Sequence, residues 1–232
     1  MDSDDVWLPH ALATLLERIE SSKVAIGSHG LADFIDRDGR LMNPGVYAAA
    51  GRHRLGLEGR RLVVRGLDQP TDFDVLINGN VLFPPGLLLA RRSAYEAAGR
   101  FDESFSGPED WDMLIRLSRF GHIEFVDEVI LHYRRHDQNF GARGTVSRQA
   151  WLVRCKAFHS PENSPDQQRR ARLGWRAYQR LMGSEAMHQV WVAVRARQMR
   201  VALRQFVRLG ASVVRYVRGW PSPRVQSGRE PW

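Results

Sequence analysis

Three aspartates at the start of the chain have the types and spacing that could bind a cation. Asp2, Asp4 and Asp5 precede Trp7 and Pro9. Closely spaced carboxylates suit a hard divalent cation, which takes oxygen ligands and bridges to substrate phosphates. Alternatively, Asp4 or Asp5 caps the helix that the sequence predicts from about Pro9. This segment therefore predicts either a metal site or a helix cap.

A second acidic cluster begins directly after Pro108 and comprises Glu109, Asp110, Trp111 and Asp112. Acidic residues in the first turn of a helix are favoured by the helix dipole, by about 0.3–1 kcal/mol each, so Glu109 and Asp110 could serve as caps alone. The alternative is that the helix start directs one of these carboxylates into a cleft, where it accepts a proton as a general base.

A third group of candidate residues begins at the end of the strand predicted over 129–133. It contains Tyr133, Arg134, Arg135 and His136, with Asn139 three residues further on. A lone histidine is more often a surface or core residue than a ligand. His136 becomes a candidate because two acidic clusters precede it in the sequence.

Together these groups resemble the family-2 glycosyltransferases of the GT-A fold, and the resemblance spans residues 1 to about 140. It rests on four motifs in the family's order, each modest alone. The motifs are Asp2 to Pro9, then Arg91-Arg92 through Gly99-Arg100-Phe101-Asp102-Glu103, then Glu109-Asp110-Trp111-Asp112 with Arg116, and finally Tyr133-Arg134 with His136 and Asn139.

The resemblance implies roles for two metal ligands and one base. Asp4 would bind a divalent cation, Mn²⁺ or Mg²⁺, on the donor's diphosphate, and His136 would complete the metal or diphosphate environment. Asp110 would take the proton from the acceptor hydroxyl as that oxygen attacks the anomeric carbon. A single displacement of this kind inverts the anomeric configuration.

The resemblance also implies a donor and acceptor site formed by Asp2, Glu109, Trp111 and Arg134. Asp2 would lie near the ribose or on the other side of the metal, and Glu109 and Trp111 would shape the acceptor site. The partners would be a nucleotide-sugar donor and a glycan, lipid-linked or protein acceptor, in glycan or cell-surface polysaccharide synthesis.

The predicted fold class is α/β, a partial GT-A (Rossmann-like) mixed sheet with flanking helices, followed by a helical extension. Apolar periodicity predicts a helix over 8–19 and strands within 24–35, while 40–70 reads as a loop. A buried strand within 82–91 precedes a short helix from Ser93 to Ala98, capped by Ser93. Pro108 opens the next helix, which Gly121 ends; strands at 123–126 and 129–133 follow, and helices continue beyond 143 with a break at 160–165.

The predicted organisation is a catalytic domain over 1–142, a basic helical extension over 143–220 and a flexible tail over 221–232. The family's domain begins about 90 residues before its aspartate-rich motif, with the part that binds the nucleotide base and ribose. We therefore expect that the N-terminal part of the domain is missing here. The chain alone would then be a poor enzyme, prone to aggregate, or a remnant of one.

The charge is unevenly distributed. Residues 1–150 carry a balance of −4 and residues 151–232 one of +12, within a total of +8. Seven arginines lie from Arg195 to Arg218, among apolar residues that do not keep to one clean stripe over 190–219. This basic segment packs against the catalytic domain, lies on an anionic membrane, or contacts nucleic acid, the last being disfavoured because no nucleic-acid motif accompanies it.

Three function classes remain open: a glycosyltransferase, a non-catalytic remnant of one, and a basic adaptor acting at membranes. One cysteine, Cys155, excludes a disulfide framework within the chain. The acidic start is unlike a signal peptide, and no apolar run approaches the roughly 20 residues of a membrane span. These features favour a cytoplasmic location, with peripheral contact at the inner face of the membrane as the alternative.

Overall fold

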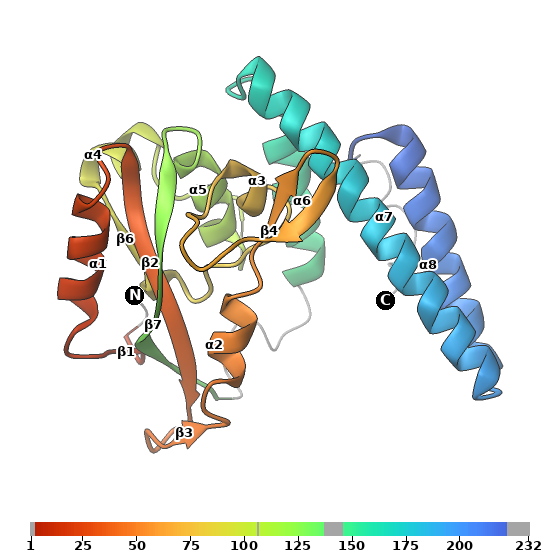
Figure 1. Ribbon diagram of the computed structural model, residues 1–232, viewed down its shortest axis with the longest axis horizontal. Coiled ribbons are helices and arrows are strands. Elements are labelled where there is room, and N and C mark those ends of the chain that lie inside the picture. The colour runs from red at the N-terminus through yellow and green to blue at the C-terminus, as the bar shows by residue number, and fades with distance from the viewer. Residues whose placement is uncertain (1–2, 106, 137–145, 222–232) are drawn as a thin grey trace. The chain divides into compact units, whose positions relative to one another are not determined.

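The computed structural model describes residues 3–105, 107–136 and 146–221, in two compact units. The first unit contains 1–56 and 63–153, and the second contains 57–62 and 154–232. The elements follow in chain order (Figure 1): β1 (Val6–Trp7), α1 (Ala11–Glu20), β2 (Ala25–Ile35), β3 (Leu41–Met42), α2 (Val46–Gly51), β4 (Leu55–Glu58), β5 (Arg61–Val64), α3 (Phe73–Leu76), the 3₁₀ helix η1 (Pro85–Leu87), β6 (Leu88–Ala90), α4 (Arg92–Ala97), α5 (Glu109–Leu117), β7 (His122–Arg134), α6 (Val146–His159), α7 (Pro165–Arg195) and α8 (Met199–Arg218).

The first unit is built on a five-stranded mixed sheet. Its two long strands, β2 and β7, run parallel and side by side (Figure 1), while β1 pairs with β7 and both β3 and β6 pair with β2, all antiparallel. The sheet brings the end of β7 beside the start of the chain, because Val6 pairs with His132 and Trp7 with Leu131. Two segments that carry predicted site residues thus become neighbours.

Helices cover both faces of this sheet. Successive residues of a strand point to opposite faces, and the neighbours Leu31 and Ala32 of β2 belong to different core clusters. Ala32 packs with Ala11 and Leu15 of α1, and Leu31 packs with Ala48 of α2. The long strands are therefore buried on both sides, as parallel strands usually are.

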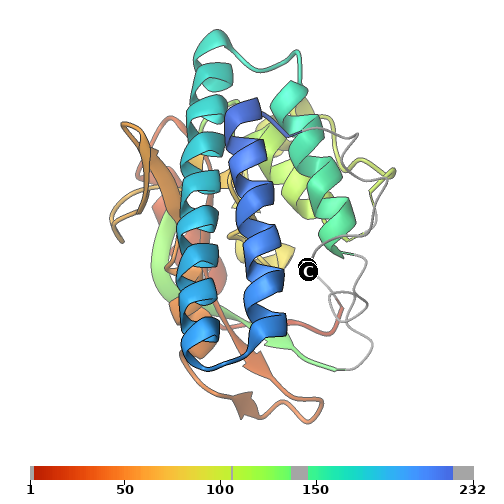
Figure 2. The ribbon, with the colours of Figure 1, turned by 90° about the vertical axis from the view of Figure 1, so that its right-hand side faces the viewer.

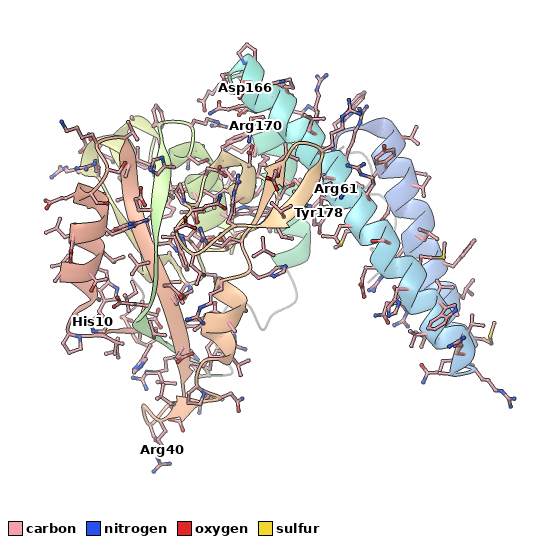
Figure 3. All side chains as sticks on the ribbon, viewed as in Figure 1. His10, Arg40, Arg61, Asp166, Arg170 and Tyr178 are labelled. Carbon is pink, nitrogen blue, oxygen red and sulfur yellow. The ribbon has the colours of Figure 1, made fainter. Side chains whose placement is uncertain are left out.

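The predicted fold class is confirmed as a mixed α/β sheet with flanking helices, followed by helices. In the turn after β2, the backbone N–H groups of Asp38 and Arg40 both donate to the Asp36 carboxylate. Figure 3 shows Arg40 projecting from this turn.

The predicted domain boundary at 142 and 143 falls within 137–145, outside the described residues, as does nearly all of the predicted tail.

Three local predictions are wrong. Residues 40–70 are not an irregular loop, because they contain β3, α2, β4 and β5. Ser93 does not cap a helix, since α4 begins one residue earlier with Arg91 at its N-cap position and no side-chain cap. The two strands predicted over 123–133 form the single strand β7, which stays paired with β2 across irregularities in register near Leu31.

A fully buried arginine organises the segment that was predicted as a loop. The Arg54 guanidinium donates to the carbonyls of Gly66 and Gln69 at 2.7 and 2.8 Å and to the Thr71 hydroxyl at 3.1 Å. It also stacks on the Phe125 ring, 3.7 Å from the centroid. Burial lowers the pKa of Arg54 to about 10. One side chain thus ties residues 66–71 to β7.

We expect Arg54→Leu to destabilise the protein by about 3 kcal/mol, because at least two backbone acceptors lose their donor in a buried site. Urea unfolding followed by circular dichroism measures this loss. The matched control is Arg92→Leu, whose side chain is 90% exposed and should change stability by less than about 0.5 kcal/mol. Equal effects of the two substitutions would show that Arg54 does not organise this segment.

The second unit contains a long helical hairpin, in which α7 and α8 lie side by side and antiparallel (Figure 2). The break predicted near 160–165 is confirmed: Ser164 caps α7, and Ser164 and Gln167 form a reciprocal capping box. Asp166 lies in the first turn (Figure 3), where the helix dipole favours an acidic side chain. Every helix in the described part of the chain is too short or too polar to cross a bilayer.

Candidate functional site

Two side chains that lie 132 residues apart in the sequence meet where β7 ends beside the start of the chain. The Oδ2 atom of Asp4 lies 2.8 Å from Nε2 of His136. Both side chains are partly exposed, at 36% for Asp4 and 22% for His136. The contact places one carboxylate and one imidazole at the surface of the first unit, where a ligand can reach them.

Arg134 and Asp5 hold this junction in place. The Arg134 backbone N–H donates to the Asp5 carboxylate at 3.1 Å, and its Nε donates to the Asp4 carbonyl at 2.9 Å. Its Nη1 donates to the carbonyls of Asp36 and Arg37 in the turn after β2. These contacts give Arg134 a positioning role for the backbone around Asp4, and its place in the donor or acceptor site stays a prediction.

The aspartates at the start of the chain do not cap the first helix. The N-cap position of α1 is His10, and no side chain caps the helix there. The capping alternative for Asp4 and Asp5 is therefore wrong. Asp2, the third aspartate of the motif, lies outside the described residues, and so does Asn139 of the last motif.

Asp110, the predicted base, lies in the first turn of α5 and is buried. Its Oδ1 accepts from the Trp111 backbone N–H at 2.6 Å, and its Oδ2 accepts from Nδ2 of Asn80 at 3.2 Å. Burial raises the pKa of Asp110 to about 6, and the charge of Glu109 adds to the rise, while the two hydrogen bonds oppose it. The carboxylate is ionised at neutral pH and is a stronger base than an exposed aspartate.

The neighbours of Asp110 mainly hold the start of α5. Glu109 accepts from the Gly107 backbone N–H at 2.6 Å, and the buried Trp111 donates from its indole to the Leu76 carbonyl of α3 at 2.7 Å. Glu109 and Trp111 were predicted to shape an acceptor site. Neither lines the two cavities beside Asp110, so these contacts favour a positioning role for both residues.

The other charged pair of this motif has a structural role. Asp112 and Arg116, one turn apart on α5, form a buried ion pair at 2.9 Å. Arg116 also donates to the carbonyls of Ala98 and Arg100, which flank the left-handed Gly99. The pair therefore connects α5 to the end of α4, at the i, i+4 spacing that places the two side chains on one face of the helix.

Two cavities adjoin the Asp110–Asn80 pair. The larger, of about 520 Å³, lies between β2, α2 and residues 80–87; Tyr47, His53, Asn80 and Phe83 are among the residues that line it. Asp110 itself lines the smaller one, with mainly apolar neighbours. The pair thus stands between a roomy, largely apolar cavity and a narrow one.

Tyr47 lines the larger cavity. Burial raises the pKa of its hydroxyl well above the usual value, and the charges of Tyr133, Asp110 and Asp5 add to the rise, while Arg135 opposes it. Its ring stacks on Phe34, with centroids 4.1 Å apart, and its hydroxyl donates to the Phe83 carbonyl. An aromatic group therefore lies within electrostatic reach of both the base candidate and the aspartate motif.

Sequence reasoning missed Asn80 and Tyr47. Asn80 lies between Gly79 and Val81 in a segment without periodicity, and Tyr47 lies in the segment interpreted as a loop. No signal in either local pattern points to a site. Their importance arises only when β2, α2 and α5 come together in the fold.

The donor set at Asp4 and His136 fits a divalent cation only in part. An octahedral ion with ligand bonds of about 2.1 Å places adjacent donor atoms about 3 Å apart, close to the observed 2.8 Å. Carboxylate oxygen and imidazole nitrogen both suit Mn²⁺. Among the described residues, however, no three His, Cys, Asp or Glu side chains converge to form a complete metal site. The remaining ligands would have to come from a substrate or from water.

Asn80 should control the titration of Asp110. We expect the Asp110 carboxyl carbon to titrate near pH 6 by NMR, and Asn80→Ala to move the midpoint higher, because a donor to the charged form is lost. The matched control is Asn78→Ala, since Asn78 donates to the Asp74 carbonyl and its loss should leave the midpoint near 6. A midpoint near the ordinary 3.8 in the unsubstituted protein would refute this account of the buried base.

The chain matches no protein-family model and no curated protein.

Proposed function

We propose that this chain carries the catalytic end of a metal-dependent, inverting glycosyltransferase of the GT-A fold, which transfers a sugar from a nucleotide-sugar donor to an acceptor hydroxyl. The observation that carries the proposal is the contact at 2.8 Å between Asp4 and His136, two residues that the resemblance assigns independently to the donor's metal and diphosphate. Their meeting across 132 residues supports one shared ligand.

On the donor side, Asp4 and His136 would hold Mn²⁺ or Mg²⁺. The ion would neutralise the negative charge that grows on the nucleoside diphosphate as it leaves. Arg134 and Asp5 support this arrangement, because their hydrogen bonds fix the backbone that presents Asp4. The rigidity matters because an ion ligand displaced by about 1 Å loses much of its effect.

On the acceptor side, Asp110 would act as the base. An alcohol is a weak nucleophile at neutral pH, so a carboxylate must accept its proton as its oxygen bonds to the anomeric carbon and the bond to the diphosphate breaks. A carboxylate with a pKa near 6 suits this task better than an exposed one. Asn80 would orient it, and the cavity of about 520 Å³ beside Asn80 would admit the acceptor.

A donor screen by thermal unfolding tests the proposal. The chain is heated with UDP-, GDP-, dTDP- and CMP-linked sugars, each with and without Mn²⁺. We expect Mn²⁺-dependent stabilisation by at least one diphosphate-linked donor, worth about 2.7 kcal/mol at 100 times its Kd, and none by CMP-linked sugars, which lack a diphosphate. Equal stabilisation with and without metal, or no response to any donor, would argue against the proposal.

A further inference from the structure

The last helix, α8, exposes an apolar face along its length. Met199, Leu203, Phe206, Val213 and Val217 recur at spacings of three, four and seven residues, which place them on one side of α8. Each is more than half exposed; Phe206 is 62% exposed and Val217 74%. So many large apolar side chains on one exposed helix face mark an interaction surface.

This face is distinct from the one that packs within the hairpin. A Cβ added to Gly183 of α7 would lie 3.7 Å from Leu209 and 3.8 Å from Ser212 of α8. The Trp175 indole of α7 donates to the Arg215 carbonyl at 3.2 Å. The buried residues of α8 are Ala202 and Ser212, which are small. The buried residues of α8 are thus small, whereas the large apolar side chains named above stay exposed, on a helix that lies beside α7 (Figure 2).

The turn before α8 explains why the stripe is hard to see in the sequence. Residues 190–219 were treated as one helical segment, in which the apolar residues keep no single phase. In the structure α7 ends at Arg195, Arg197 adopts a left-handed backbone with φ 57°, and α8 begins at Met199. The turn resets the helical phase, so the prediction of a mixed face is wrong for α8 itself.

Arginines border the exposed face. Arg200, Arg204 and Arg218 are exposed, and on a helical projection they lie together beside Val207 and Val214, which extend the apolar face. The helix contains five arginines and no acidic residue. An apolar face flanked by cations and free of acids has the charge pattern of a helix that lies in the interface of an anionic bilayer.

We propose that α8 docks on an anionic phospholipid surface, with its apolar face entering the headgroup region and its arginines on the lipid phosphates. The positive charge of α8 favours an anionic lipid surface over a second copy of the chain as the partner of this face. Two copies of α8 packed through this face would bring ten arginines together with no acidic partner on either helix. Anionic lipids supply the missing negative charge.

Vesicle flotation with the 232-residue chain tests the proposal. The vesicles are phosphatidylcholine alone, or phosphatidylcholine with 30% phosphatidylglycerol as a chosen anionic fraction, at low and high salt. We expect capture by the anionic vesicles at low salt, weaker capture at high salt because salt screens the arginines, and little capture by the neutral vesicles. Equal capture by both vesicle types, or none by either, would overturn the proposal.

Two paired variants with matched controls locate the surface. Phe206→Ser with Val217→Ser should reduce partitioning at least tenfold, whereas Leu12→Ser with Leu16→Ser, at exposed apolar positions of α1, should not. Arg200→Gln with Arg204→Gln should reduce it about fivefold per arginine, whereas Arg40→Gln with Arg92→Gln, at exposed positions of the first unit, should have little effect.

Sedimentation equilibrium and thermal unfolding of the same variants complete the test. We expect the serine pair on α8 to leave the molecular mass and the melting temperature unchanged, since both side chains are exposed in the described part of the chain. If those substitutions instead convert a dimer to a monomer, or lower the melting temperature, while vesicle binding persists, then the face packs against protein and the proposal is wrong.

Discussion

Asp110→Asn should slow sugar transfer by about 10²- to 10⁴-fold, the usual contribution of a general base, while changing the affinity for Mn²⁺ and donor less than about twofold. Only proton acceptance is lost, because asparagine has nearly the same shape. The rate is measured as release of nucleoside diphosphate from the donor found by thermal screening. In the unsubstituted protein the rate should rise with pH through about 6, as Asp110 ionises, and then level off.

The same substitution has a second expected effect that separates a functional carboxylate from a structural one. Burial raises the pKa of Asp110 from 3.8 to about 6, so its ionised form destabilises the fold. This effect is absent below about pH 4, where the group is neutral in both folded and unfolded states, and complete above about pH 6. Asp110→Asn should therefore stabilise the protein at pH 7 by about 2 kcal/mol. Asp166→Asn, at an exposed position of α7, should change neither rate nor stability appreciably. Near-normal turnover of the Asp110 variant would show that Asp110 has only a structural role in the first turn of α5.

Asp4→Asn and His136→Ala should each weaken binding of Mn²⁺ with inorganic pyrophosphate by about 100-fold or more, because each removes one of only two protein donors in the described part of the site. Isothermal titration calorimetry measures the affinity. Pyrophosphate replaces the nucleotide so that base and ribose contacts do not contribute.

Two controls accompany this prediction. His10→Ala removes a partly exposed histidine near Glu128, and Asp38→Asn removes an exposed carboxylate; neither should change the affinity. The double variant Asp4→Asn/His136→Ala should be little worse than either single variant, because donors that share one ion are not additive. Independent, additive losses would show that the two side chains bind different ligands.

The fold class was predictable because its main helices and strands have recognisable local patterns in the sequence. The apolar positions of α1 recur every three to four residues, and the run at 24–35 has the length and apolar content of a buried strand. The capping box at Ser164 and Gln167 marks the start of α7 in the same way. Such local patterns suffice because each of them depends on residues that lie close together in the sequence.

The site was predictable only in part, for a physical reason. The sequence identified Asp4, Asp110 and His136 as candidates because they belong to motifs that follow one another in the order of the family. Asn80 and Tyr47 stand in none, and their contacts with the site depend on how α2, β2 and α5 pack. The structural role of Arg54 was not predicted for the same reason. In the sequence it is a basic residue in a glycine-rich segment, which is typical of the surface, and only the fold buries it fully against residues 66–71.

The central claim, that Asp4 and His136 share one ion with a diphosphate, is tested most directly by pulsed electron paramagnetic resonance of Mn²⁺ added to the chain with pyrophosphate. We expect two couplings to the same Mn²⁺, one to phosphorus and one to an imidazole nitrogen, with only the nitrogen coupling lost in His136→Gln. A phosphorus coupling without any nitrogen coupling, or a nitrogen coupling that survives in His136→Gln, would contradict the claim.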